Sequence, residues 1–215
     1  MSGIYFHIPF CKQACHYCNF HFSTSLKHKS AVLQAMKKEL RHFAERGWQG
    51  PINTLYFGGG TPSILSVSEI EAFITQAAQL FNLDPAAEIT LEANPDDLTA
   101  DKMQELAGSS VNRLSVGIQS FNAGELRWMN RAHTPTEALE SLEATARLFP
   151  NYSLDLIYGI PGSNMELWAD NLKQALQFNP PHISAYALTV EPRTALSSFI
   201  AKGRSADVDA VSYTH

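Results

Sequence analysis

The chain has 215 residues, enough to bury a core without disulfides or metal ions as staples, and its 45% hydrophobic and 17% charged residues are typical of a globular protein. Its net charge of −5 disfavours a nucleic acid partner, because phosphate binding needs a basic surface. The amino terminus lacks a basic region followed by an apolar core, and no apolar run is long enough to span a bilayer. We therefore expect a cytoplasmic protein without a membrane segment.

Short apolar runs in the sequence predict β-strands that alternate with helical patterns. The runs are nearly all apolar, as expected for strands that are buried on both faces of a parallel sheet. The strands are predicted at Ile4–Ile8, Thr54–Phe57, Glu88–Glu92, Arg113–Ile118, Ser153–Tyr158 and His182–Leu188.

Helices are expected between the strands, and two of them carry clear start signals. Ser66 with Glu69 forms a capping box, and Thr134 is followed by a proline and by Glu137 at the third helical position. Further helices are predicted from near Ser25 to about Arg46, through Met103 and Leu106, from Thr134 to about Phe149, and from Ser163 with Glu166 to near Phe178. No helix is predicted after Leu188, because the apolar periodicity fades there.

This alternation predicts an α/β fold with a parallel sheet covered by helices. Periodicity alone does not separate an open doubly wound sheet from a partial barrel. No internal linker is visible, so we expect one core domain over residues 1–203 and an irregular tail over residues 204–215.

All three cysteines of the chain lie in one short stretch after the first strand, at Cys11, Cys15 and Cys18. Three thiolates this close can ligate three irons of a 4Fe-4S cluster and leave the fourth iron open to a small molecule. One alternative is a helical turn of buried cysteines, because this spacing places all three on one helix face. Zinc with His16 or His21 is a second alternative, and a structural disulfide is a third.

Polar residues stand at the ends of several predicted strands, where α/β folds collect their ligands. The triple glycine Gly58-Gly59-Gly60 allows close approach of the backbone, although a plain turn explains it equally well. Carboxylate, amide and guanidinium groups follow on later strands, at Glu92, Gln119, Arg131 and Asp155. Together they suit a zwitterionic ligand that carries a ribose. The alternative is that Glu92 and Asp155 form ion pairs with Arg113 or Arg131 for structure alone.

The order of these motifs resembles the radical SAM enzymes of the HemN/HemW group. The matching stretches are the cysteine motif after Tyr5-Phe6-His7-Ile8-Pro9-Phe10, Gly58–Ser63, Glu92–Pro95, Gly117–Phe121, Asn130-Arg131-x-His133 and Asp155–Gly162. The resemblance implies a parallel, TIM-like partial (β/α)6 barrel that holds a 4Fe-4S cluster. Its open iron would chelate S-adenosylmethionine, whose reductive cleavage gives a 5′-deoxyadenosyl radical.

The resemblance also assigns residues. Cys11, Cys15 and Cys18 match the cluster ligands, and Tyr17 matches an aromatic residue that packs near the adenine. The positions that match S-adenosylmethionine contacts are Tyr5, Gly59, Gly60, Thr61, Glu92, Gln119, Arg131, Asp155 and Ala187.

Phe20 separates two branches of the group. HemN-type coproporphyrinogen dehydrogenases carry a further cysteine at this position, so Phe20 favours the HemW branch, whose members are described as haem chaperones. We therefore expect a chaperone that binds haem or a porphyrin and passes haem to an acceptor protein, with an oxygen-independent coproporphyrinogen III oxidase as the alternative. The group's haem-linked His-Asn-x-x-Tyr-Trp motif is not found, so we also expect that the sequence stops before that region.

Overall fold

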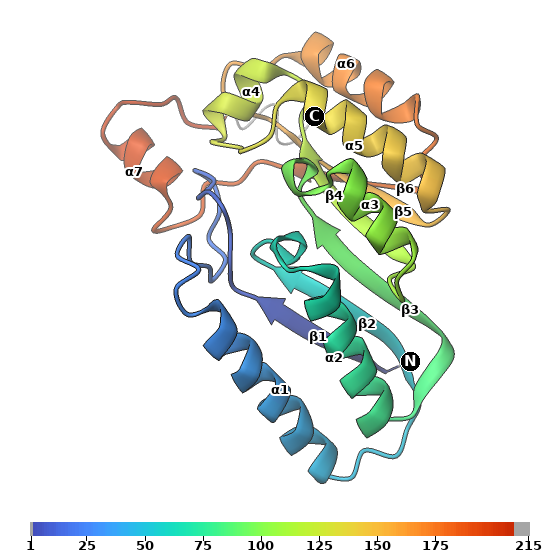
Figure 1. Cartoon of the computed structure of the whole chain (residues 1–215). Helices are drawn as coiled ribbons and strands as arrows, with labels where there is room; N and C mark the ends of the chain where they lie inside the picture. Colours follow the sequence, from blue (N-terminus) through green and yellow to red (C-terminus); the bar gives the residue numbers. More distant parts are fainter. Residues whose placement is uncertain (1, 209–215) are drawn as a thin grey trace.

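A computed structural model describes residues 2–208 of the chain. Within them, six parallel strands form one open sheet in the order β1-β2-β3-β4-β5-β6, so each strand pairs with its neighbours in the sequence (Figure 1). The strands are β1 (Gly3–Ile8), β2 (Ile52–Gly59), β3 (Leu83–Ala93), β4 (Arg113–Gln119), β5 (Tyr152–Tyr158) and β6 (His182–Ala187).

The helices that connect the strands lie along one face of the curved sheet (Figure 1). Two short 3-10 turns, η1 (Pro62–Ile64) and η2 (Pro95–Asp97), follow β2 and β3. The α-helices are α1 (Lys29–Glu45), α2 (Val67–Leu80), α3 (Ala100–Ala107), α4 (Ala123–Trp128), α5 (Pro135–Leu148), α6 (Met165–Leu176) and α7 (Ala195–Ala201).

The strand order decides between the two architectures that periodicity left open. A doubly wound sheet reverses its strand order at a switch point, whereas a barrel adds each new strand beside the last one. The sheet adds every strand in sequence, from the pairing of β1 with β2 to that of β5 with β6. The prediction of a partial (β/α)6 barrel is therefore confirmed.

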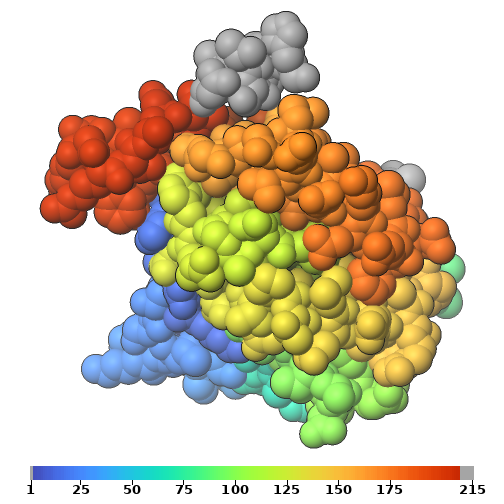
Figure 2. All heavy atoms as spheres, turned by 90° about the horizontal axis from the view of Figure 1, so that it is seen from above, coloured from blue at the N-terminus to red at the C-terminus, as the bar shows by residue number. Residues whose placement is uncertain are grey.

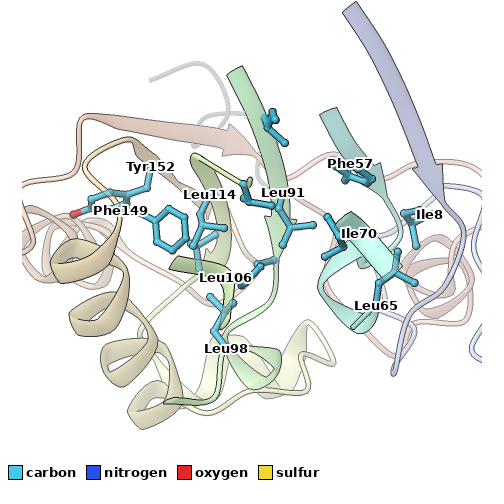
Figure 3. Close-up of a cluster of buried hydrophobic side chains, with 14 of the residues drawn as sticks. Ile8, Phe57, Leu65, Ile70, Leu91, Leu98, Leu106, Leu114, Phe149 and Tyr152 are labelled. Atoms are coloured by element: carbon cyan, nitrogen blue, oxygen red, sulfur yellow. The ribbon is translucent and has the colours of Figure 1, made fainter. Parts of the chain in front are cut away.

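The main hydrophobic core fills the space between the sheet and its helices (Figure 3). Phe57, Leu91 and Leu114 from neighbouring strands are fully buried there, together with Ile70 of α2 and Leu106 of α3. The opposite face of the sheet is more polar than predicted. Side chains such as Glu92 and Asp155 point away from this core and are only partly buried.

Helix starts follow local capping chemistry. The predicted capping box of Ser66 with Glu69 is present, and the predicted cap at Thr134 also forms a capping box, with Glu137. The cap of α6 is Asn164, one residue after the predicted Ser163, and its side chain accepts a 2.9 Å hydrogen bond from the Leu167 backbone. The α1 helix starts at Lys29 rather than near Ser25, and it has no side-chain cap.

The segment after β6 was predicted without a helix, and that prediction is wrong. Thr194 caps α7, Leu196 is buried, and the segment forms a lobe at the edge of the molecule (red in Figure 2). Leu196 belongs to a second, smaller hydrophobic cluster with Leu126, Met129, Ile157, Ile160 and Leu188. Residues 204–208 of the predicted irregular tail have no helix or strand, and residues 209–215 lie outside the described part of the chain.

None of the helices within residues 2–208 is both long and apolar enough to cross a membrane.

Candidate functional site

The three cysteines lie on a loop that begins where β1 ends. Backbone hydrogen bonds between Cys11 and Ser23 (3.0 Å) and between Ser23 and Pro9 (2.9 Å) close the base of this loop. Residues 11–18 contain no helix, so the alternative of a helical turn is wrong. All three thiols are free and partly exposed, and burial raises the pKa of Cys11 and of Cys18. We call residues 11–23 the cysteine loop.

The surroundings of the cysteine loop do not support the zinc alternative. The His16 Nδ1 atom donates a 2.7 Å hydrogen bond to the Trp128 carbonyl, which fixes the orientation of this ring. Within residues 2–208, no group of three or more His, Cys, Asp or Glu side chains is arranged to hold a single metal ion. A cubane cluster has a different requirement, because each thiolate binds a separate iron.

The triple glycine packs tightly against the start of the cysteine loop. The Gly60 and Thr61 backbone amides donate to the Ile8 and Phe10 carbonyls at 2.9 and 2.7 Å. A Cβ atom on Gly60 would lie 2.7 Å from the Phe10 carbonyl oxygen, which is too close for any side chain. The glycines therefore seat the turn after β2 directly on the loop that carries the cysteines.

A cavity of about 490 Å³ opens at the carboxyl ends of the strands, next to the cysteine loop. This volume is within the range of small-molecule sites. Its lining includes the three cysteines and nine of the ten residues expected to contact the cofactor, namely Tyr17, Gly59, Gly60, Thr61, Glu92, Gln119, Arg131, Asp155 and Ala187. The remaining residue, Tyr5, does not line the cavity. Its ring stacks on Tyr56, whose hydroxyl donates to Glu92.

The two carboxylates of the cavity are held by neutral donors. Glu92 accepts hydrogen bonds from the Tyr56 hydroxyl (2.8 Å) and the Gly59 amide (3.1 Å), and Asp155 accepts one from the Ser115 hydroxyl (3.3 Å). Burial raises the pKa of both carboxyl groups, and these hydrogen bonds offset part of the rise. Among the ion pairs of the described residues, neither carboxylate is paired with an arginine. The purely structural pairing considered from the sequence is therefore absent there.

Arg131 connects the cysteine loop to the strand ends. Its Nη2 donates to Asn94 Oδ1 (2.7 Å) and to the Gly117 carbonyl (2.8 Å), and its Nη1 lies 3.6 Å from Cys15 Sγ. Its Nε is buried and has no hydrogen-bond partner among the described residues. Among the described residues, the cavity thus combines a guanidinium group, whose Nε–H has no acceptor, with two carboxylates that have no cationic partner.

Gln119 reaches the cavity through an unusual backbone conformation. Its φ of 65° is left-handed, and the register of β4 against β5 shifts between Gly117 and Gln119. His133 Nε2 donates to the Ile118 carbonyl at 3.1 Å, just before this turn. Burial, with a contribution from Arg131, lowers the pKa of His133 to about 4, so the ring is neutral at physiological pH.

Sequence reasoning missed several residues that line the cavity. Ser115 and Gly117 share a strand face, and a period of two along β4 would have found both. Asn94 follows β3 within the Glu92–Pro95 motif, but nothing in the sequence indicated that its amide contacts Arg131. Phe22 and Glu191 lie on loops, where no periodic signal exists.

The sequence and the fold of the chain are similar to those of known proteins. A family model described as the radical SAM superfamily matches residues 5–175. Two relatives named heme chaperone HemW are each 36% identical, from Lactococcus lactis over 195 residues and from Escherichia coli over 200 residues. They cover 90% and 91% of this chain, which spans 50% and 53% of their own lengths.

A solved structure supports the same assignment. The chain superposes on the Escherichia coli radical SAM enzyme coproporphyrinogen III oxidase (HemN) with a TM-score of 0.84 and 30% identity. The match covers 96% of this chain and 48% of HemN, so the chain again spans about half of its relative. Because the family model covers most of the sequence and the barrel agrees with it, this chain belongs to the radical SAM superfamily.

Proposed function

We propose that the chain holds a 4Fe-4S cluster through Cys11, Cys15 and Cys18, binds S-adenosylmethionine beside it, and serves as a haem chaperone of the HemW type. The observation that carries the proposal is the shared cavity. Three free thiols and the groups suited to a zwitterionic, ribose-bearing molecule line the same space. When bound, the cluster would supply an electron to the sulfonium group of S-adenosylmethionine.

The residues of the cavity suit the polar groups of S-adenosylmethionine. Glu92 and Asp155 are partly buried acceptors without a cationic partner among the described residues, which suits an ammonium group and a ribose diol. Arg131 supplies the positive charge that a methionyl carboxylate needs. Tyr17 lines the same space and offers an aromatic face for the adenine. Gly59 and Gly60 keep the wall beside the cysteine loop free of side chains.

Phe20 favours the chaperone over the oxidase. Its side chain is 65% exposed, and it lines the cavity next to Cys18. A phenyl ring supplies neither the polarity nor the metal affinity of the thiol that HemN-type enzymes carry there. An exposed aromatic ring beside the cluster site is compatible with a flat, apolar ligand such as haem.

Location and partners follow from this function. Thiolates that bind iron must stay reduced, so we place the protein in the cytoplasm. A chaperone also needs a recipient, so we propose transfer of haem to an acceptor protein.

Two parallel assays test this function on the anaerobically reconstituted protein extended by the region that carries the haem-linked motif of the HemN/HemW group. In the first, the reduced protein with S-adenosylmethionine is incubated with coproporphyrinogen III, and the porphyrins are separated by chromatography. In the second, haem is titrated and followed by its Soret band. We expect a saturable Soret shift and unchanged coproporphyrinogen. Protoporphyrin that forms in proportion to protein concentration would establish the oxidase instead, and an unchanged Soret band would contradict the haem part of the proposal.

The Phe20→Cys variant serves as the matched control in the turnover assay. We expect no oxidase activity from this change alone, because the remaining residues of the substrate site would also have to differ.

A further inference from the structure

Residues 128–131, at the end of α4 and just after it, form hydrogen bonds with the cysteine loop. The backbone amide of His16 donates to the Met129 carbonyl at 3.1 Å, and its ring donates to the Trp128 carbonyl at 2.7 Å. Arg131, three residues after Trp128, approaches Cys15. The loop and this segment are far apart in the sequence, so these contacts fix a tertiary arrangement.

Within this segment, Asn130 forms three hydrogen bonds with the cysteine loop. Its Oδ1 and its backbone carbonyl both accept hydrogen bonds from Gln13 Nε2, at 2.7 and 3.1 Å. Its Nδ2 donates to the Ala14 carbonyl at 2.7 Å. Both ends of one amide side chain therefore hold the two residues that directly precede Cys15.

The geometry at position 130 requires asparagine in two separate ways. The backbone has a φ of 58°, which asparagine and glycine tolerate better than other residues. The side chain must accept from Gln13 and donate to Ala14 at once, which aspartate cannot do because an ionised carboxylate has no donor. Glycine would keep the backbone shape and remove both side-chain contacts.

Asn130 also connects the loop to the ligand cavity. The next residue, Arg131, donates to Asn94 at the end of β3 and to the Gly117 carbonyl of β4. A displacement of the turn at Asn130 would therefore move the cysteine loop and the guanidinium group together. Neither the Gln13–Asn130 contact nor the Asn130–Ala14 contact involves a cysteine.

We propose that Asn130 is a positioning residue that holds the cysteine loop in its metal-ready shape before any metal binds, with Gln13 as its partner. The part of this inference that concerns iron rests on the proposed function. The part that concerns the shape of the loop does not, because the hydrogen bonds of Asn130 are made by the protein alone.

Thiol alkylation of the metal-free protein tests the shape of the loop directly. We expect the Asn130→Gly variant to be alkylated at Cys15 and Cys18 about tenfold faster than wild type, the change that corresponds to about 1.4 kcal/mol. Asn130→Asp keeps the acceptor for Gln13 and loses only the donor to Ala14, so its rate should lie between those of wild type and Asn130→Gly. Gln13→Ala, a change at an exposed side chain, should give a similar increase, and the double variant should be no faster than Asn130→Gly alone, because the two residues act as one pair.

The matched control is Asn179→Gly. Asn179 is also left-handed, with a φ of 47°, but it is exposed and follows α6, away from the cysteine loop. It should leave the alkylation rate unchanged. Wild-type alkylation rates in both Asn130→Gly and Gln13→Ala, or an equal increase in Asn179→Gly, would overturn the proposal. If circular dichroism shows that Asn130→Gly does not fold, the alkylation rate of Gln13→Ala alone tests the proposal.

A second measurement follows iron in the reconstituted protein. Iron should pass to a chelator about tenfold faster from Asn130→Gly than from wild type, with an altered electron paramagnetic resonance signal of the reduced cluster. Wild-type protein that takes up no iron contradicts the proposed function, while the alkylation rates still decide the role of Asn130. Iron release at the wild-type rate from a variant that is alkylated faster would show that the bound metal, rather than Asn130, holds the loop, and would overturn the iron part of the inference.

Discussion

Arg131 Nη1 lies 3.6 Å from Cys15 Sγ, so the guanidinium group of the cavity and the central cysteine of the loop are direct neighbours. The same guanidinium donates to Asn94 and to the Gly117 carbonyl, which fixes it between the ends of β3 and β4. The cysteine loop and the strand ends are therefore parts of one site.

The thiols of this site should determine its metal content. Anaerobic reconstitution of the wild-type chain should give about four irons and four sulfides per chain, the stoichiometry of a cubane. Cys15→Ala should abolish this content, because the remaining two thiolates cannot hold the cluster. Iron and sulfide analysis with ultraviolet–visible spectra provides the measurement, and a wild-type protein that retains only zinc would contradict the assignment.

The Glu92 carboxylate should reduce the stability of the ligand-free protein at neutral pH. Burial raises the pKa of Glu92 in the folded state above its usual value of 4.5. Between pH 4.5 and this raised pKa, the folded state therefore binds more protons than the unfolded state. Stability therefore falls as the pH rises through this window. Glu92→Gln removes the titration and should raise the melting temperature at pH 7, with a gain that shrinks toward pH 4.5.

Thermal unfolding of the wild type and of Glu92→Gln from pH 4 to pH 8 measures this effect. The same variant should bind S-adenosylmethionine more weakly at pH 7, because it lacks the charge for an ammonium group. A melting difference that stays constant over the whole pH range would show that the change acts through packing.

Gly60, the last residue of the triple glycine, should not tolerate any side chain. A Cβ at Gly60 would lie 2.7 and 2.8 Å from the Phe10 and Ile8 carbonyl oxygens, and neither backbone atom has room to move. Gly60→Ala should cost about 1–3 kcal/mol of unfolding free energy, as overpacking generally does, and should displace the cysteine loop. Denaturant unfolding and iron content after reconstitution measure both effects.

Gly108→Ala is the matched control for this substitution. Its Cβ would meet nothing closer than 3.6 Å, at the Glu105 carbonyl, and its φ is not left-handed. The lower entropy of the unfolded chain should leave it neutral or slightly stabilised. An equal loss of unfolding free energy in both variants would show that close packing at Gly60 is not the cause.

Local sequence patterns were sufficient for most of the fold. The capping boxes at Ser66 and Thr134 act within one helical turn, so they were visible without tertiary contacts. The α7 helix could not be predicted in this way, because its position depends on contacts with residues that are distant in the sequence. The Leu196 amide donates to the His16 carbonyl at 2.8 Å, and the Phe199 ring packs edge-on against His16.

The candidate site also contains residues that the sequence indicates and residues whose roles depend on tertiary contacts. The cysteines stand out by their spacing, and Asp155 stands out because an acid inside an apolar strand is costly unless it is paired or bound. The contact between Asn130 and Gln13 joins residues 117 positions apart, and no local pattern indicates it. Likewise, Tyr56 lies within a predicted apolar strand, and nothing in the sequence indicates that its hydroxyl donates to Glu92. The candidate ligand-binding residues were predictable from their chemistry, whereas the residues that contact and position them were not.

Asp155 should contribute to S-adenosylmethionine binding without contributing to iron binding. Its carboxylate accepts hydrogen bonds from the Ser115 hydroxyl, at 3.3 Å, and from the Ser184 hydroxyl, and it lines the cavity from the middle of β5. Asp155→Asn keeps the shape of the side chain and removes its charge. Loss of a charged hydrogen bond costs about 1.5–3 kcal/mol, so the affinity for S-adenosylmethionine should fall about ten- to a hundredfold.

Calorimetric titration of the cluster-loaded protein measures this affinity, with iron content determined on the same sample. Glu88→Gln is the control, because Glu88 lies on β3 outside the cavity and faces Arg113 at 3.9 Å. It should leave the affinity unchanged. If Asp155→Asn binds S-adenosylmethionine as tightly as wild type while its iron content is intact, the role of Asp155 is to hold Ser115 and the strand end, and the ribose of the ligand must find its acceptor elsewhere in the cavity.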